Sequence, residues 1–520
     1  MLWPSILGFG IIAVYVVWIM DYFCTIRRTP SYLLVALFCA VYIPFSIILL
    51  VPIDLASSTS DNRPLLELPR EVTFATWRVL YWLAFFLTWL ILPLLQSYLE
   101  SGHNDNSKKI RDALRANARY QLITLAVGMI GLLYFYLYAG LSLTSLKALI
   151  IALSHSYSLI LSIWFMGIGV VQIPRALFLK SSPARILASL ERRAPILHDH
   201  LEESQTQFKE VTTEIRSLIP VKNGPYNDWI DSLLDEVPKT GGAPRTLTRS
   251  QVTEEYLSSL SYRLRKSKIA LARYEHEWNS LIQNAADIID IVDADGSWRL
   301  RFKFRKSTLS PRLAYFQNNF LRPGFYKIGG IVTSCFSVIL IWSEFAQGTR
   351  ASILGFISIS TFGFIQELLS FAVIAYMCIA AYSSLANVKV FNIYVLARKH
   401  TDARSAIFYA SQACRLTIPL SFSYVSMVPR KAAASVFEEF LQPSINLTPL
   451  GKYFVIWLPR FILVPVLFSY FKLYDRVQRV FGFEQEFGDD DELVGSRAEG
   501  RDLINYELIN MRSEFQLERT

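Results

Sequence analysis

The sequence predicts an all-α, polytopic membrane protein with nine transmembrane helices and a cytosolic antiparallel coiled-coil hairpin. Three observations predict this class. The 520 residues are 52% hydrophobic and 18% charged, whereas an average soluble domain carries about 25% charged residues. Nine runs approach the roughly 20 apolar residues that are needed to cross a bilayer. Two heptad patterns lie between the fifth and the sixth of these runs.

The nine apolar runs justify the predicted spans. A large soluble helical protein is the alternative, but nine runs of this length are too many for buried core helices. The first run follows only two residues and has no small-residue cleavage site after it, so we expect a retained signal-anchor. The runs cover approximately 3–20, 31–53, 77–99, 119–139, 148–173, 325–346, 354–386, 404–428 and 449–471.

Lys and Arg are distributed unequally over the short loops. Loops on one side of the predicted membrane hold eleven of them, and loops on the other side hold six. The positive-inside rule then places the N-terminus outside and the C-terminus and residues 174–324 in the cytosol. This distribution accounts for the net charge of +9 without a nucleic-acid partner. The sequon Asn446-Leu447-Thr448 falls on an external loop, so Asn446 is a candidate for glycosylation.

The chain therefore divides into four predicted parts. Residues 1–179 form the first part of the transmembrane bundle with five spans, and residues 180–320 form a cytosolic coiled-coil insert. Residues 321–475 form the second part of the bundle with four spans. Residues 476–520 contain the acidic run "GDDDEL" and are expected to be a largely disordered cytosolic tail.

Apolar residues in the insert alternate in spacing between four and three over about four heptads, from 190 to 218 and again from 257 to 288. Residues 220–246 between them are rich in Pro and Gly, which end helices. A hairpin whose two arms cover each other's seam is one interpretation. A seam that docks protein partners, or a second copy in a homodimer, is the other. The principal seam residues are Leu197, Leu201, Phe208, Val211, Ile215, Leu257, Leu264, Leu271, Trp278 and Leu281.

Ionisable residues inside predicted spans are the main candidates for chemistry, because they are costly in lipid and are usually paired or face a cavity. Matching their expected depths predicts that Glu367 pairs with Arg415 and that Glu344 pairs with Arg460. These pairs either hold helices together or line a substrate or ion path. His155 lies in mid-span and is either a packing residue or a proton relay. Asp54 ends the second run and is expected at the interface, where an acid is tolerated.

The sequence carries no signature of an enzyme. It contains no Cys-x-x-Cys, no phosphate-binding Gly-rich loop and no nucleophile elbow, and its six histidines do not form a metal-ligand cluster. We therefore predict no catalytic residue, no metal and no cofactor. In the tail, "EGRDLI" (499–504) and "YELI" (506–509) fit acidic-dileucine and tyrosine-based sorting patterns, although such short patterns also recur by chance.

Several strings together resemble the limb-region-1-like membrane proteins, also called the lipocalin-interacting membrane receptor family, with most likeness to the branch of limb-region-1 domain-containing protein two. The resemblance covers nearly the whole chain, and "PLLQSY", "IPRALF", "HTD" and "CRLTIPL" are its more specific pieces. Residues 221–246 and 429–448 depart from the family pattern. The strings are "LVPIDLASS" (50–58), "YWLAFFLTWLILPLLQSYLESG" (81–102), "MGIGVVQIPRALF" (166–178), "ILIWSE" (339–344), "YSSLANVKVFNIYVLARKHTDARSAIFYASQACRLTIPL" (382–420) and "FGFEQEF" (481–487).

The resemblance implies nine spans, an external N-terminus and a central cytosolic coiled coil. It also implies roles such as endocytic lipocalin receptor, partner in lysosomal cobalamin export, or modulator of receptor signalling. His400, Thr401, Asp402 and Arg415 match family motifs, and we expect His400 and Asp402 to cap or tether the loop between the seventh and eighth spans.

These observations predict a non-enzymatic membrane receptor or adaptor. It would sit in the plasma membrane or in endosomal or lysosomal membranes and act in signalling or endocytic trafficking. Its expected partners are the lipid bilayer, cytosolic or membrane proteins bound through the coiled coil, and a small lumenal ligand. The alternative is a transporter or transport accessory subunit with a polar path around Glu367 and Arg415.

Overall fold

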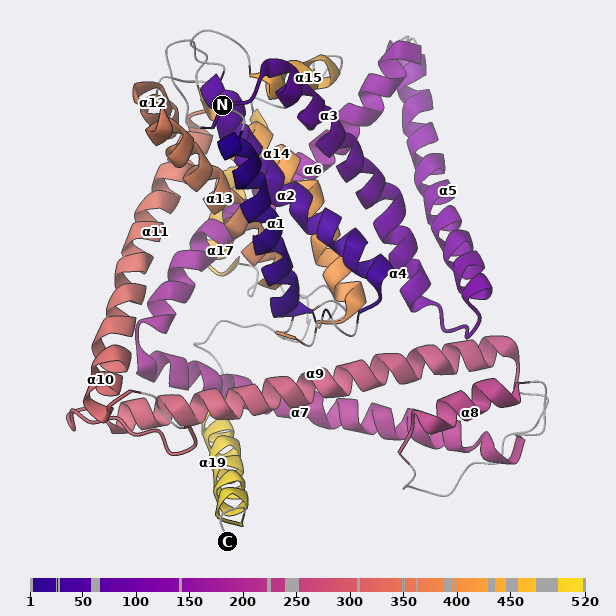
Figure 1. Cartoon of the computed structure of the whole chain (residues 1–520), viewed down its shortest axis with the longest axis vertical. Helices are drawn as coiled ribbons and strands as arrows, with labels where there is room; N and C mark the ends of the chain where they lie inside the picture. Colours follow the sequence, from indigo (N-terminus) through magenta and orange to yellow (C-terminus); the bar gives the residue numbers. More distant parts are fainter. Residues whose placement is uncertain are drawn as a thin grey trace. The chain divides into compact units, whose positions relative to one another are not determined.

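The structure is a computed structural model whose regular elements, over the part of the chain that it describes, are all helices (Figure 1). It describes residues 3–24, 26, 29–57, 66–139, 143–221, 226–238, 252–305, 309–347, 349, 351–361, 363–387, 395–396, 398–399, 401–428, 435–445, 457–473 and 494–517. The prediction of an all-α protein is confirmed for these residues.

The chain folds into two compact units. The bundle unit consists of Met1–Gln96, Arg115–Arg175 and Ile331–Tyr474. The hairpin unit consists of Ser97–Leu114, Ala176–Gly330 and Asp475–Thr520. The hairpin unit therefore combines the predicted insert with the C-terminal tail and with the segment 97–114, which contains the end of α4 (Leu92–Glu100) and the start of α5 (Asn106–Ala139).

Six helices of the described part are long and apolar enough to cross a membrane. They are α1 (Trp3–Phe23), α2 (Ser31–Ser57), the helix Arg70–Glu100 made of α3, η2 and α4, the Tyr157–Lys180 part of α6 (Leu143–Lys180), the helix Pro311–Phe345 made of α10, η5 and α11, and α13 (Phe364–Asn387). Each coincides with one of the nine predicted runs. The other three runs fall in α5 (Asn106–Ala139), in α14 (Ala403–Met427) and around the short apolar helix Leu458–Tyr470.

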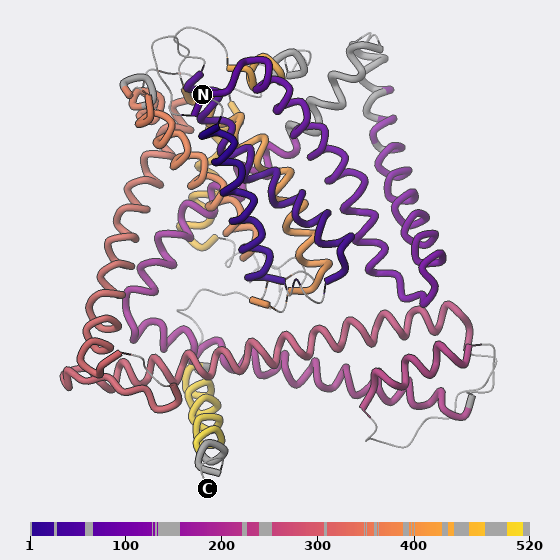
Figure 2. Tube along the Cα trace, viewed as in Figure 1, coloured from indigo at the N-terminus to yellow at the C-terminus, as the bar shows by residue number. Residues whose placement is uncertain are grey.

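The core of the bundle unit forms around α2, which packs against α1, α3, α13 and α14. Figure 2 follows these segments, which are distant in the sequence, into one bundle. Small residues let the helices approach closely, as in other membrane bundles. A Cβ built on Gly169 of α6 would lie 1.9 Å from the carbonyl oxygen of Ala380 in α13, so the two backbones touch at this glycine.

The predicted run 354–386 is not one helix. It is divided into α12 (Ile353–Ser360) and α13, and Gly363 between them has a φ of +61°. Glycine adopts this left-handed conformation without steric cost, so the chain can turn there. Glu367 consequently lies in the first turn of α13 rather than deep inside a long span.

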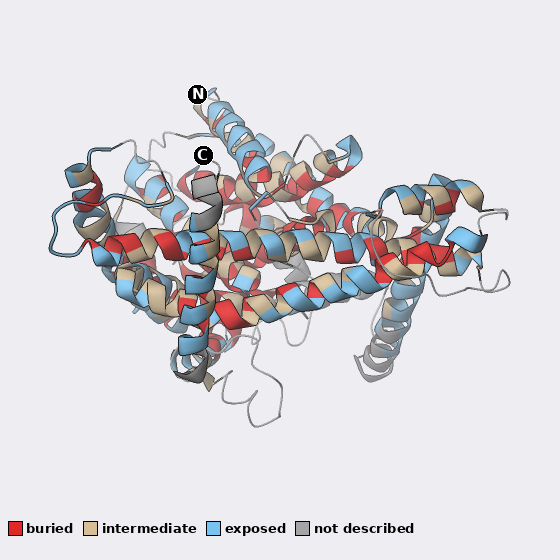
Figure 3. Ribbon diagram, turned by 90° about the horizontal axis from the view of Figure 1, so that it is seen from below, coloured by how far each residue is buried: buried red, intermediate tan, exposed pale blue. Residues whose placement is uncertain are grey.

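In the hairpin unit, α7 (Pro183–Arg216) and α9 (Glu254–Asp293) pack along each other (Figures 1 and 3). The colours of Figure 1 show that they run in opposite directions. Their length follows from uninterrupted apolar stripes, and Thr253 caps α9 by accepting a hydrogen bond from the N–H of Tyr256. The connector contains the short helix α8 (Asn227–Asp235), whose Trp229, Ile230 and Leu233 are buried against one end of the hairpin.

The C-terminal segment forms α19 (Val494–Leu517), which packs mainly on α7 and also touches α9. The expectation of a largely disordered tail is therefore wrong for residues 494–517. The acidic run that suggested disorder lies N-terminal to α19, outside the described residues.

Candidate functional site

Glu367 is buried at a helix end, where it holds a loop. Its side chain is 3% exposed, and Oε1 accepts a hydrogen bond from the backbone N–H of Leu66 at 3.2 Å. Leu66 lies in the segment between α2 and α3. A buried carboxylate that accepts a backbone N–H recovers part of the solvation that it lost on burial. This contact fixes the connection between two membrane helices.

Arg415 of α14 satisfies an irregular turn in another helix. The helix Arg70–Glu100 contains the π-helical turn η2 (Leu87–Ile91), and such a turn displaces carbonyls from the regular hydrogen-bond ladder. Arg415 Nη2 donates to the Thr88 carbonyl at 2.8 Å, and its guanidinium lies 5.7 Å from the Trp89 ring centroid. Gln121 of α5 donates to the Trp89 carbonyl at 3.0 Å. Two side chains thus satisfy the π-turn.

The predicted pairing of Glu367 with Arg415 is wrong. The Tyr424 hydroxyl of α14 donates to Ser370 Oγ of α13 at 2.8 Å, which fixes the register of these two antiparallel helices. Glu367 lies three residues before Ser370 in α13, and Arg415 lies nine residues before Tyr424 in α14. Because the two helices are antiparallel, Glu367 and Arg415 lie on opposite sides of the contact between Ser370 and Tyr424. At 1.5 Å per residue, the levels of Glu367 and Arg415 differ by roughly 18 Å. The depth argument failed because it treated 354–386 as one continuous span.

These separate contacts predict additive effects on stability. Arg415→Leu should lower the free energy of unfolding by about 1–3 kcal/mol, because the Thr88 carbonyl loses its donor in a buried place. Glu367→Leu should cost a similar amount, and the double variant should show the sum of the two. Thermal unfolding of the detergent-purified protein measures all three. A double variant that is more stable than Arg415→Leu alone would restore the ion-pair hypothesis.

The second predicted pair, Glu344 with Arg460, is also wrong. Glu344 at the end of α11 (Arg322–Phe345) is fully buried, and its Oε1 accepts the Ser423 hydroxyl of α14 at 2.6 Å. Arg460 lies in the 3-10 turn η6 (Leu458–Ile462), with its guanidinium 4.6 Å from the Trp457 ring centroid. His155 belongs to α6, but its side chain lies outside the described part of the structure.

Asp54, near the C-terminal end of α2, is a buried anchor. It is 2% exposed, and it accepts three hydrogen bonds: from Trp77 Nε1 at 3.2 Å and from the N–H groups of Val436 and Phe437 at 3.0 and 2.8 Å. Val436 and Phe437 begin α15 (Val436–Ile445), so a carboxylate of α2 caps the N-terminus of a helix that is almost 400 residues away. The sequence around Asp54 gives no indication that its carboxylate binds the N–H groups of Val436 and Phe437.

The family-motif loop contacts the end of α1. The N–H groups of Lys399 and Thr401 donate to the carbonyls of Tyr22 and Phe23 at 3.1 and 3.3 Å. Asp402 precedes the first residue of α14, and its Oδ2 accepts from Arg404 Nε at 2.9 Å. The two backbone bonds to α1 tether the loop, whereas this contact of Asp402 is local to the start of α14. His400 and Asn446 lie outside the described residues.

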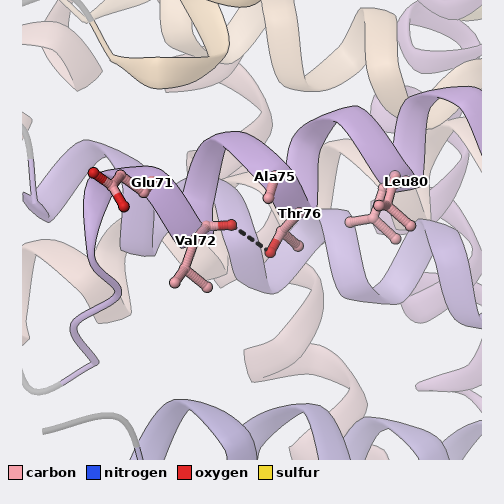
Figure 4. Close-up of a pocket in the computed structure, with 6 residues that line it drawn as sticks. Glu71, Val72, Ala75, Thr76 and Leu80 are labelled. Atoms are coloured by element: carbon pink, nitrogen blue, oxygen red, sulfur yellow. Dashed lines mark hydrogen bonds between the residues drawn. The ribbon is translucent and has the colours of Figure 1, made fainter.

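A hollow of about 440 Å³ lies along α3 (Arg70–Phe86) (Figure 4). The Thr76 hydroxyl on its wall donates to the carbonyl of Val72 at 2.7 Å, within the same helix. The wall is otherwise mainly apolar and comes from a single helix, so it offers few polar groups that converge on a ligand. The lining residues are Glu71, Val72, Ala75, Thr76, Val79 and Leu80.

The ten predicted seam residues face the inside of the hairpin unit in two clusters. The cluster near α8 contains Val211, Ile215, Leu257 and Leu264, with Phe208 at its edge. The cluster near α19 contains Leu197, Leu201, Trp278 and Leu281, with Leu271 at its edge. Helices of the same chain thus cover the seam, and the outward faces are the surfaces open to partners.

Charges of opposite sign lie on the outward faces of the two long helices. On α7, Glu202 and Glu203 are exposed, and on α9 Arg265 and Lys266 are exposed. Lys109, in the first turn of α5 in the same unit, has its pKa lowered by burial and by the nearby charge of Arg265. We call Lys109, Arg265 and Lys266 the basic stripe. Cations held close together, which raise each other's electrostatic energy, favour an anionic partner.

An ion pair between Glu214 and Arg263 ties the two arms together beside the cluster near α8. Glu214 Oε1 accepts from Arg263 at 2.7 Å and from the Tyr256 hydroxyl at 2.8 Å. Burial alone would raise the pKa of Glu214, but these two donors outweigh it and hold the pKa below its usual value. Burial and the bond to Glu214 raise the pKa of Tyr256 to about 12. A depressed carboxyl pKa contributes stability above the unfolded-state pKa, and this is lost as the pH falls through the folded pKa.

Comparison with known proteins gives a family and several relatives. The family described as "LMBR1-like membrane protein" matches residues 1–474. The human "G-protein coupled receptor-associated protein LMBRD2" is 27% identical over 489 residues, which cover 86% of this chain and 70% of the relative. The Drosophila melanogaster "LMBR1 domain-containing protein 2 homolog" is 26% identical, covering 84% and 69%. The Dictyostelium discoideum "LMBR1 domain-containing protein 2 homolog A" is 23% identical, covering 94% and 76%. No solved structure matches the chain.

The helical bundle, with six helices in the described part that are long and apolar enough to span lipid, defines an integral multi-pass membrane protein. The chain belongs to the family of LMBR1-like membrane proteins. The resemblance seen in the sequence strings is thereby confirmed, including its likeness to the second type of LMBR1 domain-containing protein. The family is described by its membrane location and not by a reaction.

Proposed function

We propose that this protein is a receptor-associated membrane adaptor that recruits cytosolic partners through the outward faces of its hairpin unit. The observation that carries the proposal is the basic stripe of Lys109, Arg265 and Lys266, which lies on a rigid helical hairpin whose apolar seam is covered by its own chain. A relative is named as associated with G-protein coupled receptors, which supports the same class of role for this chain.

The proposed topology has nine spans, an external N-terminus and a cytosolic C-terminus, with the hairpin on the cytosolic side. The excess of Lys and Arg in loops on that side supports this orientation. The partner segment is acidic, because an acidic chain gains Coulomb energy at the basic stripe and relieves the repulsion between its cations. Signalling or endocytic trafficking is the setting that we propose, in the plasma membrane or in endosomal or lysosomal membranes.

The alternative, a transporter with a polar path around Glu367 and Arg415, rests on a pairing that the structure replaces with two separate contacts. The buried acids of the bundle unit bind backbone N–H groups and a hydroxyl, which suits anchors for loops and helix ends. The adaptor is therefore the function that the geometry supports best.

The proposal predicts that reversing the basic stripe removes partners. In the full-length protein, Arg265→Glu with Lys266→Glu should lower the recovery of cytosolic neighbours in proximity labelling about tenfold, because two attractions become repulsions. Glu202→Lys with Glu203→Lys on α7 is the matched control and should leave those neighbours in place. Recovery should also fall as the salt concentration rises. The same set of neighbours with the reversed stripe would refute the adaptor proposal.

A further inference from the structure

The contact of α19 with α7 is built around a buried carboxylate. Glu191 of α7 is 3% exposed, and its two oxygens accept from Arg497 Nε at 2.7 Å and from Arg501 Nε at 3.1 Å. The two arginines are one helical turn apart, so one face of α19 meets one acid. Both guanidinium groups remain at least half exposed, and water screens such pairs, so they guide the docking more than they strengthen it.

A glycine lets the two backbones meet at the same place. Pro195 of α7 has no N–H, so the carbonyl of Glu191, four residues earlier, is left out of the helical ladder. Gly500 of α19 lies against that carbonyl, and a Cβ at Gly500 would be 1.7 Å from the oxygen. A side chain at this position is incompatible with the docked helix.

Docking buries Ile504, partly buries Leu503 and leaves Glu499 exposed. Ile504 is 1% exposed and packs in the cluster with Ala194, Leu197 and Trp278. Ile504 also ends the acidic-dileucine pattern Glu499-x-x-x-Leu503-Ile504. A protein that reads this pattern must take the apolar side chain of Ile504 into a pocket of its own, so it competes with the hairpin for the same atoms.

We propose that α19 masks this sorting pattern while it is docked and presents it when it leaves α7. The protein that binds the released α19 is a cytosolic sorting adaptor, which recognises an acidic residue followed, after three residues, by two aliphatic side chains. Twenty residues, 474–493, join the last described residue of the bundle unit to α19. A tether of this length gives an effective concentration in the millimolar range, so weak docking is populated and remains reversible. This inference depends on the cytosolic tail of the proposed function, but not on the basic stripe.

The first test measures docking in the purified full-length protein by hydrogen–deuterium exchange. Gly500→Ala adds a methyl group that collides with α7, while alanine favours helix formation, so the helix itself is not weakened. Exchange over 494–511 should become roughly tenfold faster in this variant. Asn505→Ala, on the exposed face, is the matched control and should exchange like the wild type. Fast exchange in the wild type would overturn the docking.

The second test measures sorting in cells. Gly500→Ala leaves Glu499, Leu503 and Ile504 in place, and should lower the surface fraction about twofold by shifting the tail to its released state. Adding Leu503→Ala and Ile504→Ala should return the surface fraction to the wild-type value. An unchanged surface fraction in a variant whose exchange shows release would overturn the masking. Antibody access to a C-terminal tag before and after permeabilisation reports separately on the cytosolic placement.

Discussion

Asp54→Ala is expected to lower the free energy of unfolding by about 4 kcal/mol, the larger of the two main effects that the structure predicts. The substitution leaves the indole N–H of Trp77 and the N–H groups of Val436 and Phe437 without their acceptor, and each buried donor left unsatisfied costs about 1–3 kcal/mol. Thermal unfolding in detergent measures the loss, and hydrogen exchange over 435–445 should show that α15 is released first.

Two controls accompany this experiment. Asp54→Asn keeps one carbonyl acceptor and should cost about half as much, because only some of the three N–H donors lose their acceptor. Arg70→Ala removes the exposed pair between Arg70 and Glu439 of α15, at 2.7 Å, and should cost far less than Asp54→Ala, because water screens an exposed ion pair. If Asp54→Ala were as stable as Arg70→Ala, the carboxylate would not be the anchor of α15.

Gly169→Ala is the second large effect, with an expected loss of about 3 kcal/mol. Its new Cβ would lie 1.9 Å from the carbonyl oxygen of Ala380, which is backbone and cannot rotate away. The helices α6 and α13 must therefore separate, and the buried contacts between them are lost over more than one residue. A fall in melting temperature of the purified protein measures the effect.

Gly10→Ala in α1 is the matched control for this substitution. A Cβ at Gly10 meets nothing within 4 Å, and alanine favours a helix over glycine by about 1 kcal/mol. Gly10→Ala should therefore be neutral or slightly stabilising. A Gly169→Ala protein that unfolds at the same temperature as Gly10→Ala would show that the two backbones do not meet at residue 169.

The hairpin arms illustrate what periodicity can predict. Spacing of three and four placed Leu201 and Leu281 on a buried face, and the structure buries both in one cluster with residues of the opposite arm. The same alternation of four and three is present in the tail, where the face of α19 that meets the hairpin carries Arg497, Arg501, Ile504, Leu508 and Met511. The acidic run before α19 favoured a disordered tail, and this shorter stripe, which indicates a helix, was not recognised.

The intramembrane residues illustrate what periodicity cannot predict. Hydropathy gives the depth of a residue only if its span is continuous, and one glycine with a positive φ at residue 363 moved Glu367 from mid-span to a helix end. Arg415 was recognised as a costly charge, but its partner is a carbonyl that a π-helical turn releases from another helix. A carbonyl of this kind carries no signal in the side-chain sequence.

The sequence by itself determined that lipid is the solvent for much of this chain, that the protein is helical, and that two long apolar stripes form a hairpin. Each of these properties depends on residues that are close together in the sequence, so local composition and spacing are enough to predict it. Only the tertiary structure decided which groups satisfy Asp54, Glu344, Glu367 and Arg415, and that α19 covers part of the hairpin. Those partners are mostly backbone atoms from segments far along the chain, and their positions depend on helix breaks and helix register that local sequence does not encode.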